Sequence, residues 1–104
     1  MLIKLVEIKQ DSDVKKFTNE TERNYFLSEI IVNSEHIVCM REDTSLEQQL
    51  LETKEMFPPD LDERQSFTRL NLQRGQLGID IVVVGSLKVV CEKINKIEKR
   101  LLTG

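Results

Sequence analysis

Few residues of this chain have the types and spacing that catalysis requires. The single histidine, His36, follows the polar stretch 33–35 and could act as a base with Glu35 or Asp43 nearby. Neighbouring residues of a strand point to opposite faces, however, and no serine or second acid lies at a spacing that would build a relay. We therefore expect His36 to be a partly exposed turn residue, and the inventory favours a protein that is not an enzyme.

Metal and phosphate chemistry also lack their usual residue patterns. Cys39 and Cys91 lie far apart among apolar neighbours, whereas a metal or redox site needs clustered cysteines with further ligands. We expect both to be small core residues, and we expect no metal and no cofactor. Gly75 and Gly78 resemble half of a phosphate-binding loop, but such a loop needs a following helix, and here strand-like runs lie on both sides. A hairpin turn is the better interpretation.

The charges separate an acidic middle from a basic end. Six acidic and two basic residues give residues 44–66 a net charge of −4, while residues 86–104 carry +3, within a total of −3. The acidic total and the scarcity of aromatic residues disfavour nucleic acid as a partner. A small anion such as a nucleotide could instead be held between subunits near the start of the last helix. The candidate residues for such a site are Arg69, Arg74, Lys88 and Lys93.

Five apolar runs along the chain predict a five-stranded sheet. The runs are residues 2–8, 26–32, 37–40, 67–72 and 79–84. The links 33–35 and 75–78 contain turn-forming residues, and so predict two antiparallel hairpins. The last run is apolar on both faces, which places it centrally. We expect one α+β domain, residues 1–104, with a small antiparallel sheet arranged as a meander or like a barrel.

Residues 86–102 have the pattern of an amphipathic helix capped by Ser86. Apolar residues recur at spacings of 3 and 4 and form one stripe, namely Leu87, Val90, Ile94, Ile97 and Leu101. The stripe could pack on the chain's own sheet, or it could form a two-helix seam with another copy. Both interpretations stay open at this point.

Residues 44–66 interrupt the strand pattern as an acidic helical insert on a hairpin. Thr44 or Ser45 could cap a short helix, and Pro58 would stop it. Its apolar side would carry Leu46, Leu50 and Leu51. We expect the polar run 59–64 to be a solvated loop. We also expect residues 45–64 to be removable without loss of the fold.

Three segments together resemble a known bacterial family. Residues 33–37 resemble an N-x-x-x-I step, residues 68–75 a T-x-I-x-L-x-x-G strand and turn, and residues 86–94 an S-x-x-x-V-x-x-K-I helix start. This combination, over about half of the chain, resembles the FlbD family of short proteins associated with flagella and swarming. The resemblance implies a small antiparallel sheet closed by a C-terminal helix, and it implies no catalytic residues.

The expected function is that of an interaction protein. No run of about 18 apolar residues is present, so we expect a cytoplasmic protein without a membrane span. Because of the polar stretches, few residues remain to form a core, and self-association would bury more apolar surface. We therefore expect a homo-oligomeric adaptor of bacterial or bacteriophage origin that binds an unidentified protein partner. The alternative is a binder of a small anionic ligand between subunits.

Overall fold

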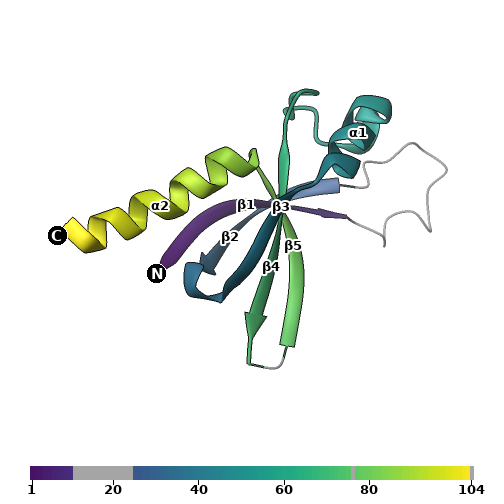
Figure 1. The fold of residues 1–104 in the computed structure, drawn as a ribbon. Coiled ribbons are helices and arrows are strands. Elements are labelled where there is room, and N and C mark those ends of the chain that lie inside the picture. Colours follow the sequence, from purple (N-terminus) through teal and green to yellow (C-terminus); the bar gives the residue numbers. More distant parts are fainter. Residues whose placement is uncertain (11–24, 76, 104) are drawn as a thin grey trace.

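Five strands form one antiparallel sheet in the order β2-β1-β5-β4-β3 (Figure 1). The strands are β1 (Leu2–Gln10), β2 (Tyr25–Asn33), β3 (Ile37–Glu42), β4 (Phe67–Arg74) and β5 (Leu77–Val84), and the helices are α1 (Thr44–Glu52) and α2 (Leu87–Thr103). Two 3-10 turns, η2 (Ser34–His36) and η3 (Lys54–Met56), complete the elements. The predicted α+β class with an antiparallel sheet and a C-terminal helix is confirmed.

The structure is a computed structural model that describes residues 1–10, 25–75 and 77–103, and for Arg74 and residues 96–103 it describes the backbone alone. The polar segment 11–23, which the sequence predicts to be a long loop or a frayed extension, lies outside the described residues.

The β4–β5 hairpin agrees with the sequence-based expectation, and β5 is the central strand of the sheet as predicted. Arg74 pairs with Leu77, so the link is two residues long and β5 begins earlier than the apolar run suggests. Gly75 has a φ of 66°, a conformation that glycine adopts without the steric cost of a Cβ. Gly78 is a strand residue paired with Gln73, and the turn does not include it.

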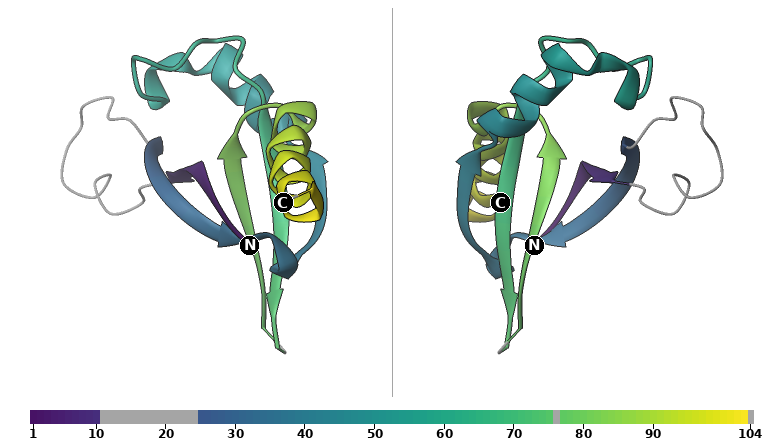
Figure 2. Two further views of the ribbon diagram at one scale, coloured as in Figure 1. Left: turned by 90° about the vertical axis from the view of Figure 1, so that its left-hand side faces the viewer. Right: turned by 90° about the vertical axis from the view of Figure 1, so that its right-hand side faces the viewer.

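The hairpin predicted between β2 and β3 is wrong, because these strands are the two opposite edges of the sheet (Figure 2). The intervening residues form η2, in which Asn33 Oδ1 accepts from the backbone N–H of Glu35 at 3.1 Å. The N–H of Ser34 donates to the carbonyl of Met1 at 2.8 Å and so extends the contact with the start of β1. This backbone group is therefore not used to turn the chain back, and η2 carries the chain across to the other edge.

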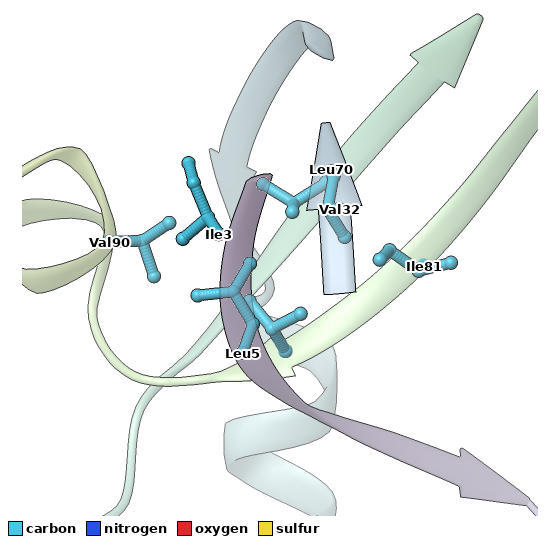
Figure 3. Close-up of a cluster of buried hydrophobic side chains, with 7 residues drawn as sticks. Ile3, Leu5, Val32, Leu70, Ile81 and Val90 are labelled. Atoms are coloured by element: carbon cyan, nitrogen blue, oxygen red, sulfur yellow. The ribbon is translucent and has the colours of Figure 1, made fainter. Parts of the chain in front are cut away.

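One hydrophobic cluster lies on the face of the sheet that α2 contacts, which we call the inner face. Strand alternation brings its members to this face from four strands, and Val90 comes from α2 (Figure 3). The buried members are Ile3, Leu5, Val32, Leu70, Ile81, Val83 and Val90. Ile94 packs against them one helical turn beyond Val90. The cluster thus joins β1 and β2 to β4 and β5.

A second cluster lies on the opposite face, the outer face, and the acidic insert supplies most of it. Leu46 and Leu50 of α1 pack with Phe57 and Leu61 against Phe67 of β4, and all five are buried. The insert is therefore part of the core, and the expectation that residues 45–64 are dispensable for folding is wrong. Within the predicted solvated run 59–64, Leu61 is buried while the other residues are exposed.

Two details of α1 differ from the sequence-based expectation. The N-cap is Asp43, whose Oδ1 accepts from the N–H of Leu46 at 2.9 Å, and neither Thr44 nor Ser45 has this role. Leu51 is exposed, because only positions four apart, Leu46 and Leu50, face the sheet. Ser86 does cap α2 as predicted, with its Oγ accepting from the N–H of Val89 at 3.2 Å.

Candidate interaction surface

An apolar hollow lies where the end of β2 meets the β4–β5 hairpin. It has a volume of about 370 Å³. Its lining comes from β2, η2, β4 and β5, and consists of Ile30, Ile31, Val32, Asn33, His36, Leu72, Gln73, Leu77 and Ile79. We call it the β2 pocket. Six of these nine side chains are aliphatic, so the pocket suits an apolar group.

The shape of the sheet produces this pocket. β1 and β5 form only one backbone pair, Glu7 with Val83, whereas β4 and β5 stay paired along their whole length. The hairpin tip consequently extends beyond the ends of the other strands (Figures 1 and 2). Leu77 and Ile79 on this tip are exposed, and so is Ile31 across the pocket. Large aliphatic side chains gathered in this way mark interaction surfaces more often than isolated exposed ones do.

The two edges of the sheet differ in a way that bears on pairing with other chains. β3 is short, its register shifts between Ile37 and Cys39, and it ends in the charged residues Arg41 and Glu42. A bulge and charges are devices that keep an edge from pairing with another strand. β2 has no such bulge, since its nine residues pair with β1 in one unbroken register. Within the described residues, no strand covers the outer side of β2.

The one charge in the middle of β2 is neutralised within the chain. The carboxylate of Glu29 lies 3.2 Å from the ammonium group of Lys4 on the neighbouring strand, and both side chains are about two-thirds exposed. Such a surface pair contributes little to stability. Its relevance is that the β2 edge presents no uncompensated charge at its centre.

The basic residues predicted to hold an anion are not brought together. Arg69 lies on the outer face, where its Nη2 is 2.8 Å from Asp43 Oδ2 and its Nη1 is 4.0 Å from Asp80 Oδ2. Lys88 and Lys93 are exposed on α2, which contacts the inner face. Arg74 ends β4 at the hairpin tip. Arg69 is therefore separated by the sheet from the two lysines and is already paired with carboxylates.

A second arginine lies beside Arg69, and no local sequence pattern indicates it. Arg41 pairs directly across from Arg69 in the β3–β4 ladder. The two guanidinium groups border a recess of about 130 Å³ that is also lined by Cys39, Asn71 and Asp80. Only the strand pairing reveals this juxtaposition, because 27 intervening residues separate Arg41 from Arg69 in the chain.

The described part of the apolar stripe on α2 packs against the sheet. Val90 is buried in the inner-face cluster, Ile94 packs against that cluster, and Leu87 is half-buried. The side chains of Ile97 and Leu101 lie outside the described residues. Packing on the chain's own sheet, one of the two open interpretations, thus describes the first half of the helix. The ribbon of α2 continues past the start of β1 (Figure 1).

The candidate reactive side chains lie apart from one another. His36 is half-buried in η2 and lines the β2 pocket, whereas Asp43 lies beyond the far end of β3. Cys39 is exposed, so its expected place in the core is wrong, because the bulge in β3 turns it away from the inner face. Cys91 is half-buried. Among the described residues, no three His, Cys, Asp or Glu side chains form a group that could hold a metal ion.

At the other end of the sheet, Tyr25 begins β2 and closes the outer-face cluster. Its ring stacks on Phe57 with centroids 4.5 Å apart, and its hydroxyl donates to Gln49 Oε1 at 2.7 Å. Partial burial raises the pKa of the Tyr25 phenol above its ordinary value, and the nearby carboxylate of Asp43 raises it further. β2 is thus anchored at its first residue, and its exposed apolar residues follow.

Comparison with protein-family models, with curated proteins and with solved structures finds no match for this chain. Among the described residues, no helix combines the length and the apolar character needed to cross a bilayer.

Proposed function

We propose that this protein is a non-enzymatic, cytoplasmic interaction protein that assembles with copies of itself and binds another macromolecule. The observation that carries the proposal is the apolar β2 pocket beside an unprotected strand edge. Exposed edges and apolar hollows are costly to keep in water, and proteins that retain them use them for association. The proposed bacterial or bacteriophage origin rests on the resemblance of residues 33–37, 68–75 and 86–94 to the FlbD family.

Self-association can be measured directly. We expect light scattering at micromolar concentration to give a mass at least twice the 12.1 kDa of one chain. The melting temperature should also rise with protein concentration, because association stabilises the folded state by mass action. Added salt should change the mass little, since the contacts are apolar. A monomer mass with a concentration-independent melting temperature would contradict the proposal.

Binding of a macromolecule is proposed to use the hairpin tip, where Leu77 is the most exposed large apolar residue of the described chain. Random extended peptides displayed on phage can be selected on the immobilised protein. We expect apolar peptides to be enriched, and we expect the Leu77→Ser variant to lose them. The Leu51→Ser variant is the control, because Leu51 is similarly exposed but lies on α1. Equal enrichment on both variants would rule out the hairpin tip.

The second candidate function is the binding of a small anion, and the pair Arg41 and Arg69 favours it. Arg41 and Arg69 lie directly opposite one another beside the recess described above, and a phosphate group there would accept from Arg41 while competing with Asp43 and Asp80 for Arg69. A nucleotide at one hundred times its dissociation constant would stabilise the protein by about 2.7 kcal/mol. Thermal melting with a panel of nucleotides therefore separates this candidate from the first, for which no nucleotide should change the melting temperature.

A further inference from the structure

We propose that a second copy of this chain pairs antiparallel with the outer edge of β2, centred on Glu29, and inserts its Phe26 into the β2 pocket. The inference rests on the self-association proposed above and specifies its geometry. Two features carry it. In the part of the chain that the structure describes, no strand covers the edge of β2, which is unbroken over nine residues, and the pocket lies at one end of that same edge.

The register follows from strand geometry. The N–H and C=O groups that point outward from an edge belong to every second residue, so an antiparallel pair of identical strands must place residues of like parity opposite each other. The two-fold axis therefore passes through a residue. Only an axis at Glu29, the middle residue of Tyr25–Asn33, pairs all nine residues of the strand. This arrangement places Phe26 opposite Val32 of the second copy.

The pocket and Phe26 are complementary in position and chemistry. Phe26 shares the inner face with Ile30 and Val32, because these residues alternate along the strand. Four consecutive residues of β2 line the pocket, so residues from both faces of this edge strand border it. Phe26 is 43% exposed in the isolated chain. Its ring, brought opposite Val32, would enter an apolar space of about 370 Å³, and symmetry repeats this contact at the other end.

The outer face of the same register is also complementary. Leu27 lies opposite Ile31 of the second copy, and both are exposed aliphatic residues in the isolated chain. Cross-strand pairs of this kind stabilise a sheet. At the axis the two Glu29 carboxylates meet, but each has its own Lys4 at 3.2 Å, so the four groups have no net charge. The edge is thus compatible with itself in shape, in apolar contacts and in charge.

The length of the β2 edge sets the depth of contact that a specific dimer requires. Nine residues at about 3.4 Å each give an edge about 31 Å long. Side chains on both faces of the edge then need a depth of only about 16 Å to bury roughly 500 Å² per copy, or roughly 1,000 Å² in total, where specific interfaces begin. Insertion of Phe26 into the pocket adds to this contact.

A symmetric disulfide tests the register. We start from a variant with Cys39→Ser and Cys91→Ser, which has no native thiol, and add Glu29→Cys. The two new thiols should be within bonding distance, because Cα atoms must lie within about 7 Å for a disulfide and directly opposite residues do. Mild oxidation should therefore convert the protein to a covalent dimer. Ile31→Cys in the same background is the control, since its copy lies four residues away along the edge, about 13 Å, and should not cross-link.

A second experiment tests whether the β2 edge forms the dimer contact, without any cross-link. Ile31→Lys should weaken the dimer at least tenfold in sedimentation equilibrium, because a lysine on an edge strand opposes pairing. Val38→Lys on β3 is the matched control and should leave the dimer unchanged, since Val38 is 58% exposed and Ile31 is 64% exposed. A dimer that survives Ile31→Lys and does not cross-link through residue 29 overturns the β2 geometry but leaves self-association standing. A monomer at all concentrations overturns both.

Discussion

At the scale of single residues, Asp43 joins three elements. It follows β3, its Oδ1 caps α1 at Leu46, and its Oδ2 accepts from Arg69 on β4 at 2.8 Å. The carboxylate is almost fully buried. We predict that Asp43→Ala lowers the free energy of unfolding by roughly 1–3 kcal/mol, because it removes an N-cap and a charge-assisted hydrogen bond. Urea denaturation measures this change.

The conservative variant Asp43→Asn separates the two contributions. Its amide oxygen can still accept from the N–H of Leu46, so the cap is retained while the negative charge beside Arg69 is lost. We expect a smaller loss of stability than for Asp43→Ala. Equal losses in the two variants would mean that the cap contributes nothing.

Tyr25 predicts how stability responds to alkaline pH. It is the one tyrosine of the chain, so the absorbance of tyrosinate reports this residue alone. Its pKa in the folded protein lies above the ordinary value of 10.0, and the folded state therefore holds the phenol proton more tightly than the unfolded state. The resulting stabilisation is complete below pH 10.0 and is lost as the pH rises through the folded-state pKa.

The physical reason is that partial burial removes water from the phenolate and that the carboxylate of Asp43 repels it. We expect spectrophotometric titration of the folded protein to give a higher pKa than titration in denaturant. The Tyr25→Phe variant should show a weaker decline of stability above pH 10.0. Identical titration of Tyr25 in the folded and unfolded protein would contradict this prediction.

The cap at Asp43 also shows what local sequence can determine. Asp43, Thr44 and Ser45 are three adjacent residues that all cap helices well. The choice among them depends on where β3 stops, and the pairing of Glu42 with Thr68 sets that point. The sequence therefore predicts the helix but not its first residue. In α2 only Ser86 is available as a cap, and the prediction there is confirmed.

At the scale of elements, the acidic insert tests whether burial or mere hydrophobicity decides stability. Leu50 and Leu51 are neighbours in α1, but Leu50 is fully buried and Leu51 is 64% exposed. We predict that Leu50→Ala costs about 2–5 kcal/mol, because it leaves a cavity among Phe57, Phe67 and its other neighbours. Leu51→Ala should stay within about 0.5 kcal/mol of the parent. Thermal or urea unfolding of the two variants makes the comparison, and equal losses would show that α1 does not pack as described.

The sequence predicts which segments form strands better than it predicts which strands lie side by side in the sheet. Apolar alternation identifies five strands, and the unbroken apolar run of β5 indicates its central position, which is confirmed. The link after Asn33 contains the same residue types as a hairpin turn. Whether it turns back or crosses to the other edge depends on the contact of Ser34 with Met1, far away in the sequence. The β2 pocket depends on that crossing, and local pattern could not reveal it.

At the scale of the whole molecule, the sheet has a core on each face. α2 covers part of the inner face and the α1 insert covers part of the outer face, and both helices begin at the end of the sheet where β3 and β5 end (Figure 1). The molecule is elongated, with extents of 54 × 31 × 20 Å and a radius of gyration of 15.5 Å, against about 13 Å for a compact domain of this size. This shape leaves the hairpin tip and the β2 edge uncovered, and it makes the proposed association physically reasonable.

The two cores should nevertheless unfold together, because the same strands serve both. β4 contributes Phe67 to the outer-face cluster and Leu70 to the inner-face cluster, and β5 likewise has residues in contact with both. Neither cluster can be lost without disrupting a strand that the other requires. We therefore predict a single cooperative transition in urea at each protein concentration.

Two signals report different parts of the molecule. The chain has one tyrosine and no tryptophan, so intrinsic fluorescence follows Tyr25 in the outer-face cluster, while circular dichroism at the helical wavelengths follows α2 together with α1. We expect the two transitions to coincide. Leu50→Ala on the outer face and Val90→Ala on the inner face should each lower the urea midpoint, because each removes side-chain volume from a buried site. Within each variant, the midpoints of the two signals should shift by the same amount, because the whole chain unfolds in one transition. Separate midpoints, or a variant that shifts one signal alone, would show that each face of the sheet folds independently.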